Sequence, residues 1–426
     1  MKRIVGIDFG TSNSSVAINH DGQTETILVQ GGDTTPSDVH AYFDGKQVEF
    51  TAGRGAIESY LSHLPVNPKK EMQVLVPNIK KGIPHETCDG SLLWAETQVD
   101  GAWPKAYVST VDIASRIFIE LNQSVIAKTG TPITEAIVGR PVKFGQNISE
   151  QELAFERLKS AAKTAGIDRI DFLEEPVAAA RGLVDDSDII NNGLVLDIGG
   201  GTTDVALISK KSGRVMQVTS SAGREIGGLD VDKSLFERKV VPQLGGKATY
   251  DKGSRLPNIL LDSLPDVHRL SDFVQPSYIR ALNEISRKHD CTDKNGVALL
   301  IDTLETGAIP VILKAVEKVK KTLQSTSTAT INVDLEKVKL NVQVERHELK
   351  TAEHKLRNAV VESIDECLKK ADVSEQEVDV VFRVGGAARS NFVSVILDEK
   401  FPQAKVVVDE DLTAVTRGLS QSRTTF

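Results

Sequence analysis

The stretch Val195-Leu-Asp-Ile-Gly-Gly-Gly-Thr-Thr-Asp-Val-Ala-Leu-Ile208 predicts two apolar strands joined by a glycine turn. Three consecutive glycines let the backbone turn tightly and approach a ligand, and successive amide N–H groups in such a turn form an anion-binding concavity. Asp197 ends the first strand, and a carboxylate beside a phosphate needs a cation such as Mg2+ between them. We therefore predict a phosphate-binding hairpin, although a glycine-rich hairpin can also be purely structural.

A second copy of this pattern lies near the N-terminus, in Ile4-Val-Gly-Ile-Asp-Phe-Gly-Thr-Ser-Asn-Ser-Ser-Val-Ala-Ile18. Four residue pairs match at one constant separation along the chain: Asp8 with Asp197, Gly10 with Gly199, Val16 with Val205, and Ala17 with Ala206. Two such hairpins indicate an internal duplication, with a ligand held between the two copies.

Each half also contains a segment rich in small residues that ends in Arg-Gly-Leu, at Glu175–Leu183 and Asp411–Leu419. Pro176 suits the first turn of a helix in the earlier segment. Alanine and glycine permit close contact between helices, so we predict that the two helices cross each other. Two unrelated small-residue helices are the alternative.

Periodicity predicts the other main elements. A helix is expected to begin at Ser149, where Ser149-x-x-Glu152 forms a capping box, and another opens at Pro310. The strand Val378–Val384 runs into Gly385 and Gly386, and ligands gather at the carboxyl ends of strands in open α/β sheets. Spacing alone does not separate site residues from solvent-facing charges at the following positions: Lys80, Lys81, Glu317, Lys320 and Lys321.

Composition limits the class of protein. With 40% hydrophobic and 26% charged residues, the 426-residue chain can bury the core of two or more domains. Its first residues do not form a signal peptide, and no apolar run approaches the length of a membrane span. The net charge of −8 comes without a basic cluster. We therefore expect a cytoplasmic protein that binds neither nucleic acid nor membrane.

The cysteines do not indicate a disulfide framework, because there are only three and they are scattered: Cys88, Cys291 and Cys367. His85 with Cys88 and His289 with Cys291 would form a zinc site only if the fold brought the two pairs together. Neither pair has a customary zinc-ligand spacing, so unrelated side chains are the favoured interpretation.

Taken together, the motifs resemble those of the nucleotide-binding domain of heat shock protein 70 (DnaK-type) chaperones, members of the actin-like ATPase superfamily. Among these, the chain looks most similar to the lone-domain YegD-type proteins. The matching segments follow the family's order over nearly the whole chain: Gly6–Asn13, Glu175–Ala180, Asp197–Val205, Gly227–Asp232 and Val384–Arg389.

The resemblance implies an α/β, two-lobed actin-like ATPase fold with duplicated ribonuclease-H-like sheets and inserted subdomains. Lobe I would be residues 1–182, with an insertion at about 37–106, and would be completed by the C-terminal helix 411–426. Lobe II would be residues 183–410, with an insertion at about 227–344. ATP would lie in the cleft between the lobes.

The resemblance also implies roles for individual residues. Asp8 and Asp197 would hold hydrated Mg2+, Glu175 would orient the attacking water or accept its proton, and Lys80 would contact the γ-phosphate and the water. K+ is a further candidate ion. The phosphate-binding residues would be Gly10, Thr11, Ser12, Asn13, Gly199, Gly200, Gly201, Thr202 and Thr203, with Thr202 also counted as catalytic. The adenosine-binding residues would be Gly228, Glu317, Lys320, Lys321, Gly385, Gly386, Arg389 and Asp411.

Three positions depart from the family pattern and leave the base preference open. Lys321 stands where arginine is usual, and an ammonium cannot stack on a base as a planar guanidinium can. Gln324 and Ala387 replace hydroxyl residues. The stretch between Asp232 and Glu317 is longer than in typical members, so ordinary exchange-factor binding is not expected.

We expect a Mg-dependent ATPase of low turnover that binds ATP or ADP, works as a nucleotide-gated two-lobe switch, and serves an unknown protein partner or client. The sequence ends at Phe426, soon after the second crossing helix, so we expect no peptide-binding domain. A filament-forming bacterial actin-like protein and a non-hydrolysing nucleotide-binding adaptor are the alternatives. A sugar kinase is less favoured, because no further acid stands out as a base for a sugar hydroxyl.

Overall fold

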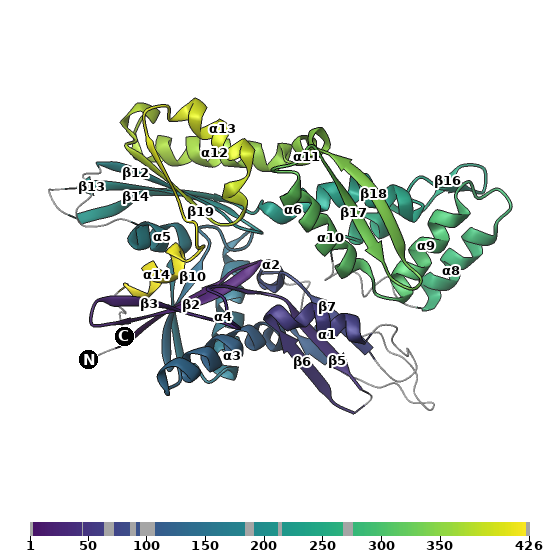
Figure 1. Cartoon of the computed structure of the whole chain (residues 1–426), viewed down its shortest axis with the longest axis horizontal. Coiled ribbons are helices and arrows are strands. Elements are labelled where there is room, and N and C mark those ends of the chain that lie inside the picture. The colour runs from purple at the N-terminus through teal and green to yellow at the C-terminus, as the bar shows by residue number, and fades with distance from the viewer. Residues whose placement is uncertain are drawn as a thin grey trace.

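The computed structural model describes residues 3–44, 46–63, 72–85, 91–93, 107–183, 191–211, 215–266 and 276–422. Figure 1 shows two lobes, each built on a central sheet and each carrying a smaller subdomain. A cluster of buried apolar residues fills each lobe, and a third cluster lies between the two central sheets.

The central sheet of the first lobe has the strand order β3-β2-β1-β10-β11. Its first three strands are antiparallel, and β10 and β11 then run parallel to β1. The short strand β4 pairs with β2. The strands are β1 (Ile4–Phe9), β2 (Asn13–His20), β3 (Gln23–Ile27), β4 (Thr35–Pro36), β10 (Glu135–Arg140) and β11 (Arg169–Glu174).

The central sheet of the second lobe repeats this topology in the order β14-β13-β12-β19-β20. Again the first three strands are antiparallel and the last two run parallel to β12. The strands are β12 (Asn192–Ile198), β13 (Thr203–Lys211), β14 (Val215–Arg224), β19 (Val380–Val384) and β20 (Lys405–Val408). The predicted duplication is therefore confirmed, and the two glycine turns are the equivalent β1–β2 and β12–β13 connections.

Helices α5 (Glu175–Leu183) and α14 (Ala414–Ser420) cross between the two sheets, as predicted (Figure 1). Their approach leaves no room for a side chain at the glycine of either Arg-Gly-Leu ending. A Cβ atom on Gly418 would lie 1.7 Å from the carbonyl oxygen of Ala178, and one on Gly182 would lie 2.1 Å from that of Ala414. The crossing is thus fixed by backbone contact.

Longer helices cover the outer faces of the two sheets. In the first lobe these are α3 (Thr110–Thr129) and α4 (Ile148–Thr164), and in the second α12 (His354–Ala371) and α13 (Asn391–Lys400). The predicted start of α4 is wrong, because Asn147 is its N-cap and accepts a hydrogen bond from the Glu150 amide. Asn147-x-x-Glu150 and Ser149-x-x-Glu152 both fit a capping pattern, so the sequence allowed either register.

The smaller subdomains of the two lobes lie on the same side of the molecule, at the right in Figure 1. The first contains β5 (Val39–Phe43), β6 (Val48–Ala52), α1 (Ala56–Ser62), β7 (Met72–Val76), α2 (Ile79–Gly82), β8 (Ser91–Leu93) and β9 (Tyr107–Ser109). The second contains α6 (Gly228–Leu235), β15 (Thr249–Tyr250), β16 (Ser254–Arg255), α7 (Asn258–Ser263), α8 (Pro276–Arg287), α9 (Lys294–Glu305), α10 (Ile309–Thr322), β17 (Thr328–Asp334), β18 (Lys339–Glu345) and α11 (Arg346–Ala352).

Within the described residues, no single helix has the length and apolar character needed to cross a membrane. Helices α9 and α10 meet that test only as a pair, and the chain bends by 106° between them.

Candidate functional site

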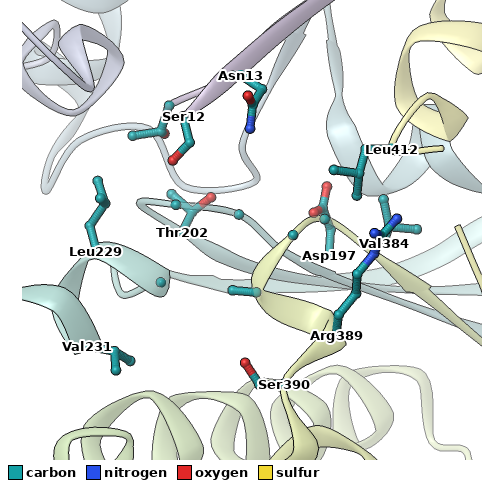
Figure 2. Close-up of a pocket in the computed structure, with 18 of the residues that line it drawn as sticks. Ser12, Asn13, Asp197, Thr202, Leu229, Val231, Val384, Arg389, Ser390 and Leu412 are labelled. Atoms are coloured by element: carbon teal, nitrogen blue, oxygen red, sulfur yellow. The ribbon is translucent and has the colours of Figure 1, made fainter. Parts of the chain in front are cut away.

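A cavity of about 520 Å³ lies between the lobes and is lined by both glycine turns and by residues of α2, α5, α6 and α10. Its volume lies in the range of sites for small molecules and cofactors. Figure 2 shows Ser12 and Asn13, from the first turn, facing Thr202 and Asp197 from the second. Arg389 and Leu412 lie along another wall of the same space.

The two glycine turns contact each other and a third glycine segment. The Gly199 amide donates to the carbonyl oxygen of Thr202 at 3.0 Å, which closes the second turn. A Cβ atom on Gly200 would lie 2.3 Å from the Ser12 hydroxyl, so a side chain there would push against the first turn. Gly228 donates to the Gly199 carbonyl oxygen at 3.0 Å, which fixes the N-terminal end of α6 beside the turn.

Several buried carboxylates lie beside these turns. Burial, reinforced by the charge of Glu175, raises the pKa of Asp8 to about 7. The same two causes raise the pKa of Asp204 to about 7 and that of Asp197 well above its ordinary value. The charge of Asp8 also raises the pKa of Asp197, because both carboxylates line the same cavity.

The buried ammonium group of Lys80 partly neutralises this negative charge. Its ammonium group lies 2.5 Å from Glu175 Oε1, and its side chain is only 6% exposed. Burial lowers the pKa of Lys80, but the carboxylates of Glu175 and Asp8 outweigh burial and raise it overall. Lys80 is therefore a charged group inside the cavity rather than part of a solvated surface.

The donor set fits a hard divalent cation such as Mg2+. Oxygen ligands suit that ion, and the buried carboxylates of Asp8 and Asp197 both line the cavity. Among the described residues, however, no three acidic, histidine or cysteine side chains are placed to chelate a metal by themselves. Mg2+ here would therefore keep most of its ligands as water or phosphate oxygens, which is its usual habit in phosphate sites.

Helix α10 supplies charged groups to a second part of the cavity. The Lys320 ammonium donates to Asp232 Oδ2 at 2.6 Å and to the Gly228 carbonyl oxygen at 2.9 Å. Glu317 pairs with Lys321 at 2.7 Å, but the Lys321 side chain is 70% exposed. Lys320 is thus held within the cavity wall, whereas Lys321 stands at its rim.

The turn after β19 forms the opposite wall. Gly385 has φ +83°, and a Cβ atom there would lie 2.5 Å from the Ile198 carbonyl oxygen, so only glycine suits this position. The Arg389 guanidinium donates to the carbonyl oxygens of Asp409 and Glu410. These bonds tie the turn to the segment that leads into α14.

Most of the predicted site residues line this one cavity. They are Asp8, Gly10, Thr11, Ser12, Asn13, Lys80, Glu175, Asp197, Gly199, Gly200, Thr202, Gly228, Glu317, Lys320, Lys321, Gly385, Gly386 and Arg389.

Three predicted residues are not among those that line it. Gly201 packs against Thr11, and the buried Thr203 hydroxyl donates to the Ile226 carbonyl oxygen. Asp411 is not a lining residue, whereas its neighbours Asp409 and Leu412 are. The reason is the turn between β20 and α14, in which Leu412 adopts φ +57°.

Sequence reasoning missed Glu353, Asp409 and Leu412 as site residues, because they reach the cavity only through tertiary contacts. Asp204, beside the second glycine turn, adds buried negative charge but is not among the residues that line the cavity. Of the residues in the zinc hypothesis, Cys88 lies outside the described residues and Cys291 is buried. No cluster suited to zinc occurs in the described part of the chain.

The duplicated sheets and the cavity between them define the class of protein, an α/β protein with the two-lobed actin-like ATPase fold. Within this class the Hsp70 protein family matches residues 4–251 and 294–420. The chain therefore belongs to the Hsp70 family. The family match omits residues 252–293, which include α7 and α8.

Individual relatives agree with this assignment at low identity. The chain is 26% identical over 437 residues to the mitochondrial-type heat shock protein 70 of Encephalitozoon hellem. This match covers 97% of the present chain and 62% of that relative. It is 25% identical over 447 residues to the chaperone protein DnaK of Deinococcus deserti, covering 99% of this chain and 60% of that protein. The chain thus spans less than two thirds of these relatives' length.

Family membership supports a nucleotide-binding ATPase domain, since Hsp70 proteins bind ATP or ADP with Mg2+. The finer likeness to YegD-type proteins, the cytoplasmic location and the protein client stay predictions.

Proposed function

We propose that this protein binds Mg2+ with ATP in the cavity and hydrolyses the nucleotide slowly, with the two lobes acting as a nucleotide-gated switch. The observation that carries the proposal is the pair of equivalent glycine turns facing each other above an excess of buried carboxylates. Phosphate oxygens between those turns would accept hydrogen bonds from the turn amides. A divalent cation would supply the positive charge that the buried carboxylates lack.

Each wall of the cavity has a role in this proposal. The turns at 10–13 and 199–202 would hold the phosphates, and Asp8 and Asp197 would hold the hydrated Mg2+. Bound Mg2+ would neutralise charge on the phosphate oxygens. Gly228, Glu317, Lys320, Gly385, Gly386 and Arg389 would surround the nucleoside, with Lys321 at the rim.

Hydrolysis would depend on positioning and charge, as is usual for phosphoryl transfer. A water oxygen attacks the γ-phosphorus, the bond from that phosphorus to the bridging oxygen breaks, and ADP leaves. Glu175 would orient the water and accept its proton, and Lys80 would hold Glu175 in place while facing the γ-phosphate. The 2.5 Å contact between Lys80 and Glu175 supports this division of roles.

The switch follows from contacts that join the lobes across the cleft. The Tyr60 hydroxyl donates to the Gly307 carbonyl oxygen, Lys314 pairs with Asp38 at 2.8 Å, and Lys81 pairs with Asp230. A ligand shifts an equilibrium toward the state to which it binds more tightly. ATP held by both lobes would therefore favour closure, and loss of the γ-phosphate would weaken it.

Calorimetry and phosphate release together test the proposal. Wild-type protein should bind ATP with Mg2+ and release phosphate slowly, whereas Asp8→Asn and Asp197→Asn should lose Mg-dependent binding. Glu175→Gln should retain nucleotide binding but slow hydrolysis by about 10²-fold or more, as expected for loss of a general base. Absence of ATP binding by the wild type would refute the proposal. Binding that raises the melting temperature without phosphate release would favour the adaptor alternative.

A further inference from the structure

The cavity extends beyond Lys320 to a wall whose polar groups have no role in the proposed hydrolysis. Gln324 lies in the turn that directly follows α10, and it lines the cavity together with Lys320. Glu353, between α11 and α12, lies beside it, and both side chains line the cavity. Figure 2 shows two other lining residues, Val231 and Ser390, across the cavity from Ser12 and Asn13.

Hydrogen bonds fix the orientation of the Gln324 amide. Its Oε1 atom accepts from the Asn391 amide at 3.0 Å, and its Nε2 atom donates to Glu353 Oε1 at 3.1 Å. The Asn391 side chain also donates to the Gln324 carbonyl oxygen at 2.6 Å. Because the amide oxygen is already turned toward Asn391, the amide nitrogen must face Glu353, and Glu353 is held as an acceptor.

Glu353 is an unusual group to find in this wall. Only 6% of the residue is exposed, and burial raises the pKa of its carboxyl despite the hydrogen bond from Gln324 and the charges of Arg357 and Lys320. The cavity lining also includes the apolar side chains of Val231 and of Leu356, which follows Glu353 by three residues in α12. A buried acidic side chain among apolar groups is costly unless a donor meets it. This end of the cavity therefore suits a flat apolar ring that carries an N–H group on its edge.

We propose that Glu353, oriented by Gln324, is a specificity-determining residue that accepts a hydrogen bond from the 6-amino group of adenine. The inference rests on the proposed function, in which the phosphates occupy the glycine turns and the base extends along α10. A 6-oxo purine would place a carbonyl oxygen against the carboxylate, and two acceptors in contact repel each other. The chain would thus select adenine by a side chain from the α11–α12 junction.

The test compares ATP with ITP, which has an oxo group at position 6 and a proton on N1. Wild-type protein with Mg2+ should bind ATP about 10- to 100-fold more tightly than ITP by calorimetry, the range expected for one good base-edge contact. Glu353→Gln should reduce this ratio to within about threefold, because an amide can turn its N–H toward the oxo group. Glu362→Gln, on the exposed face of α12, is the matched control and should leave the ratio unchanged.

A second measurement needs no variant, so it holds even if Glu353→Gln fails to fold. Purine riboside triphosphate lacks the 6-substituent, and wild-type protein should bind it about tenfold more weakly than ATP because the donor to Glu353 is missing. Equal binding of ATP, ITP and the purine analogue, or an unchanged ATP-to-ITP ratio in Glu353→Gln, would overturn the assignment of Glu353 but not the proposed function. Failure of wild-type protein to bind any of the three would overturn both this assignment and the proposed function.

Discussion

Lys80 illustrates how burial gives one of two adjacent lysines a distinct environment. It is charged, only 5% exposed, and surrounded by Glu175 and Asp8. The two lysines of the pair at 80–81 look equivalent in sequence, yet Lys81 is 39% exposed at its side chain and pairs with Asp230 across the cleft. Burial therefore separates their roles.

Replacing Lys80 should destabilise the fold far more than replacing its neighbour. Lys80→Ala leaves the Glu175 carboxylate buried without its partner, and such a loss costs about 3 kcal/mol or more. Lys81→Ala removes a partly exposed pair and should cost less than about 1 kcal/mol. Urea denaturation of the nucleotide-free variants measures both values. Equal losses in the two variants would contradict the interpretation of Lys80 as a buried cation.

The raised pKa of Asp8 predicts a particular pH dependence of stability. Its pKa is about 7 in the folded protein, against 3.8 for an ordinary aspartate. Between pH 3.8 and about 7, the folded state therefore keeps a proton on Asp8 that the unfolded state has lost. The nucleotide-free protein should therefore lose stability as pH rises from about 4 to about 7, because ionisation of the buried group becomes costly.

Asp8→Asn tests this origin directly. The variant should show a flatter stability-to-pH curve and, at pH 7.5, should be more stable than wild type by about 1 to 3 kcal/mol. Thermal unfolding across the pH range is the measurement. Mg2+ with nucleotide should flatten the wild-type curve as well, since the cation favours the ionised carboxylates. A curve unchanged by the substitution would show that other groups control the dependence.

Among the secondary-structure elements, the crossing pair α5 and α14 controls how the two sheets meet. Ala178 and Leu419 contribute to the apolar cluster between the sheets, together with Val195 and Phe382 from the second sheet. This arrangement places Glu175, the first residue of α5, at the cavity. Helix packing and site geometry are therefore linked.

Adding one methyl group at this crossing should be severely disruptive. In Gly418→Ala the new carbon would overlap the Ala178 carbonyl group, which is backbone and cannot move aside alone. We expect a loss of about 3 kcal/mol or more in unfolding free energy, at the upper end for overpacking. Gly55→Ala is the control, because its Cβ atom would meet only the Thr51 methyl at 3.4 Å. Comparable stability of the two variants would contradict the described helix contact.

Most secondary-structure elements were predictable from local pattern, but some of their ends and contacts were not. The hairpins follow from apolar alternation around glycine turns, and the small-residue helices from composition. Asp411 was misplaced because the left-handed turn at Leu412 leaves no sequence signal, since bulky residues rarely adopt that conformation. Glu353 was missed because it joins the cavity through Gln324, a contact between distant segments. Such contacts exist only once the chain has folded.

Over the whole molecule, the subdomains close the cleft through specific pairs. Lys314 of α10 is the partner of Asp38 Oδ2, while Asp38 Oδ1 is buried without a partner. Lys314 also lies 3.7 Å from Glu317, which lines the cavity. The contact between the lobes is thus adjacent to the proposed nucleoside site.

Removing this pair should speed nucleotide release. In Lys314→Ala the closed state retains Asp38 as a buried, unpaired acid, whereas the open state can hydrate it, so opening becomes easier. The dissociation rate of a fluorescent ATP analogue, measured by stopped flow, should rise about fivefold or more. Lys318→Ala, an exposed change on the same helix, should leave the rate unaltered. An unchanged rate for Lys314→Ala would mean that other contacts govern opening.

Helix α14 also packs against the very start of the chain. A Cβ atom on Gly6 would lie 2.5 Å from the Ser420 amide nitrogen, and the Ser15 and Thr416 hydroxyls are hydrogen-bonded. On a ribosome, β1 and β2 emerge before the strands of the second lobe, and the helix that packs against them emerges after those strands. Their packing surface must therefore stay uncovered while the second lobe is made, so the lobe that is begun first is completed only after the other lobe has been synthesised.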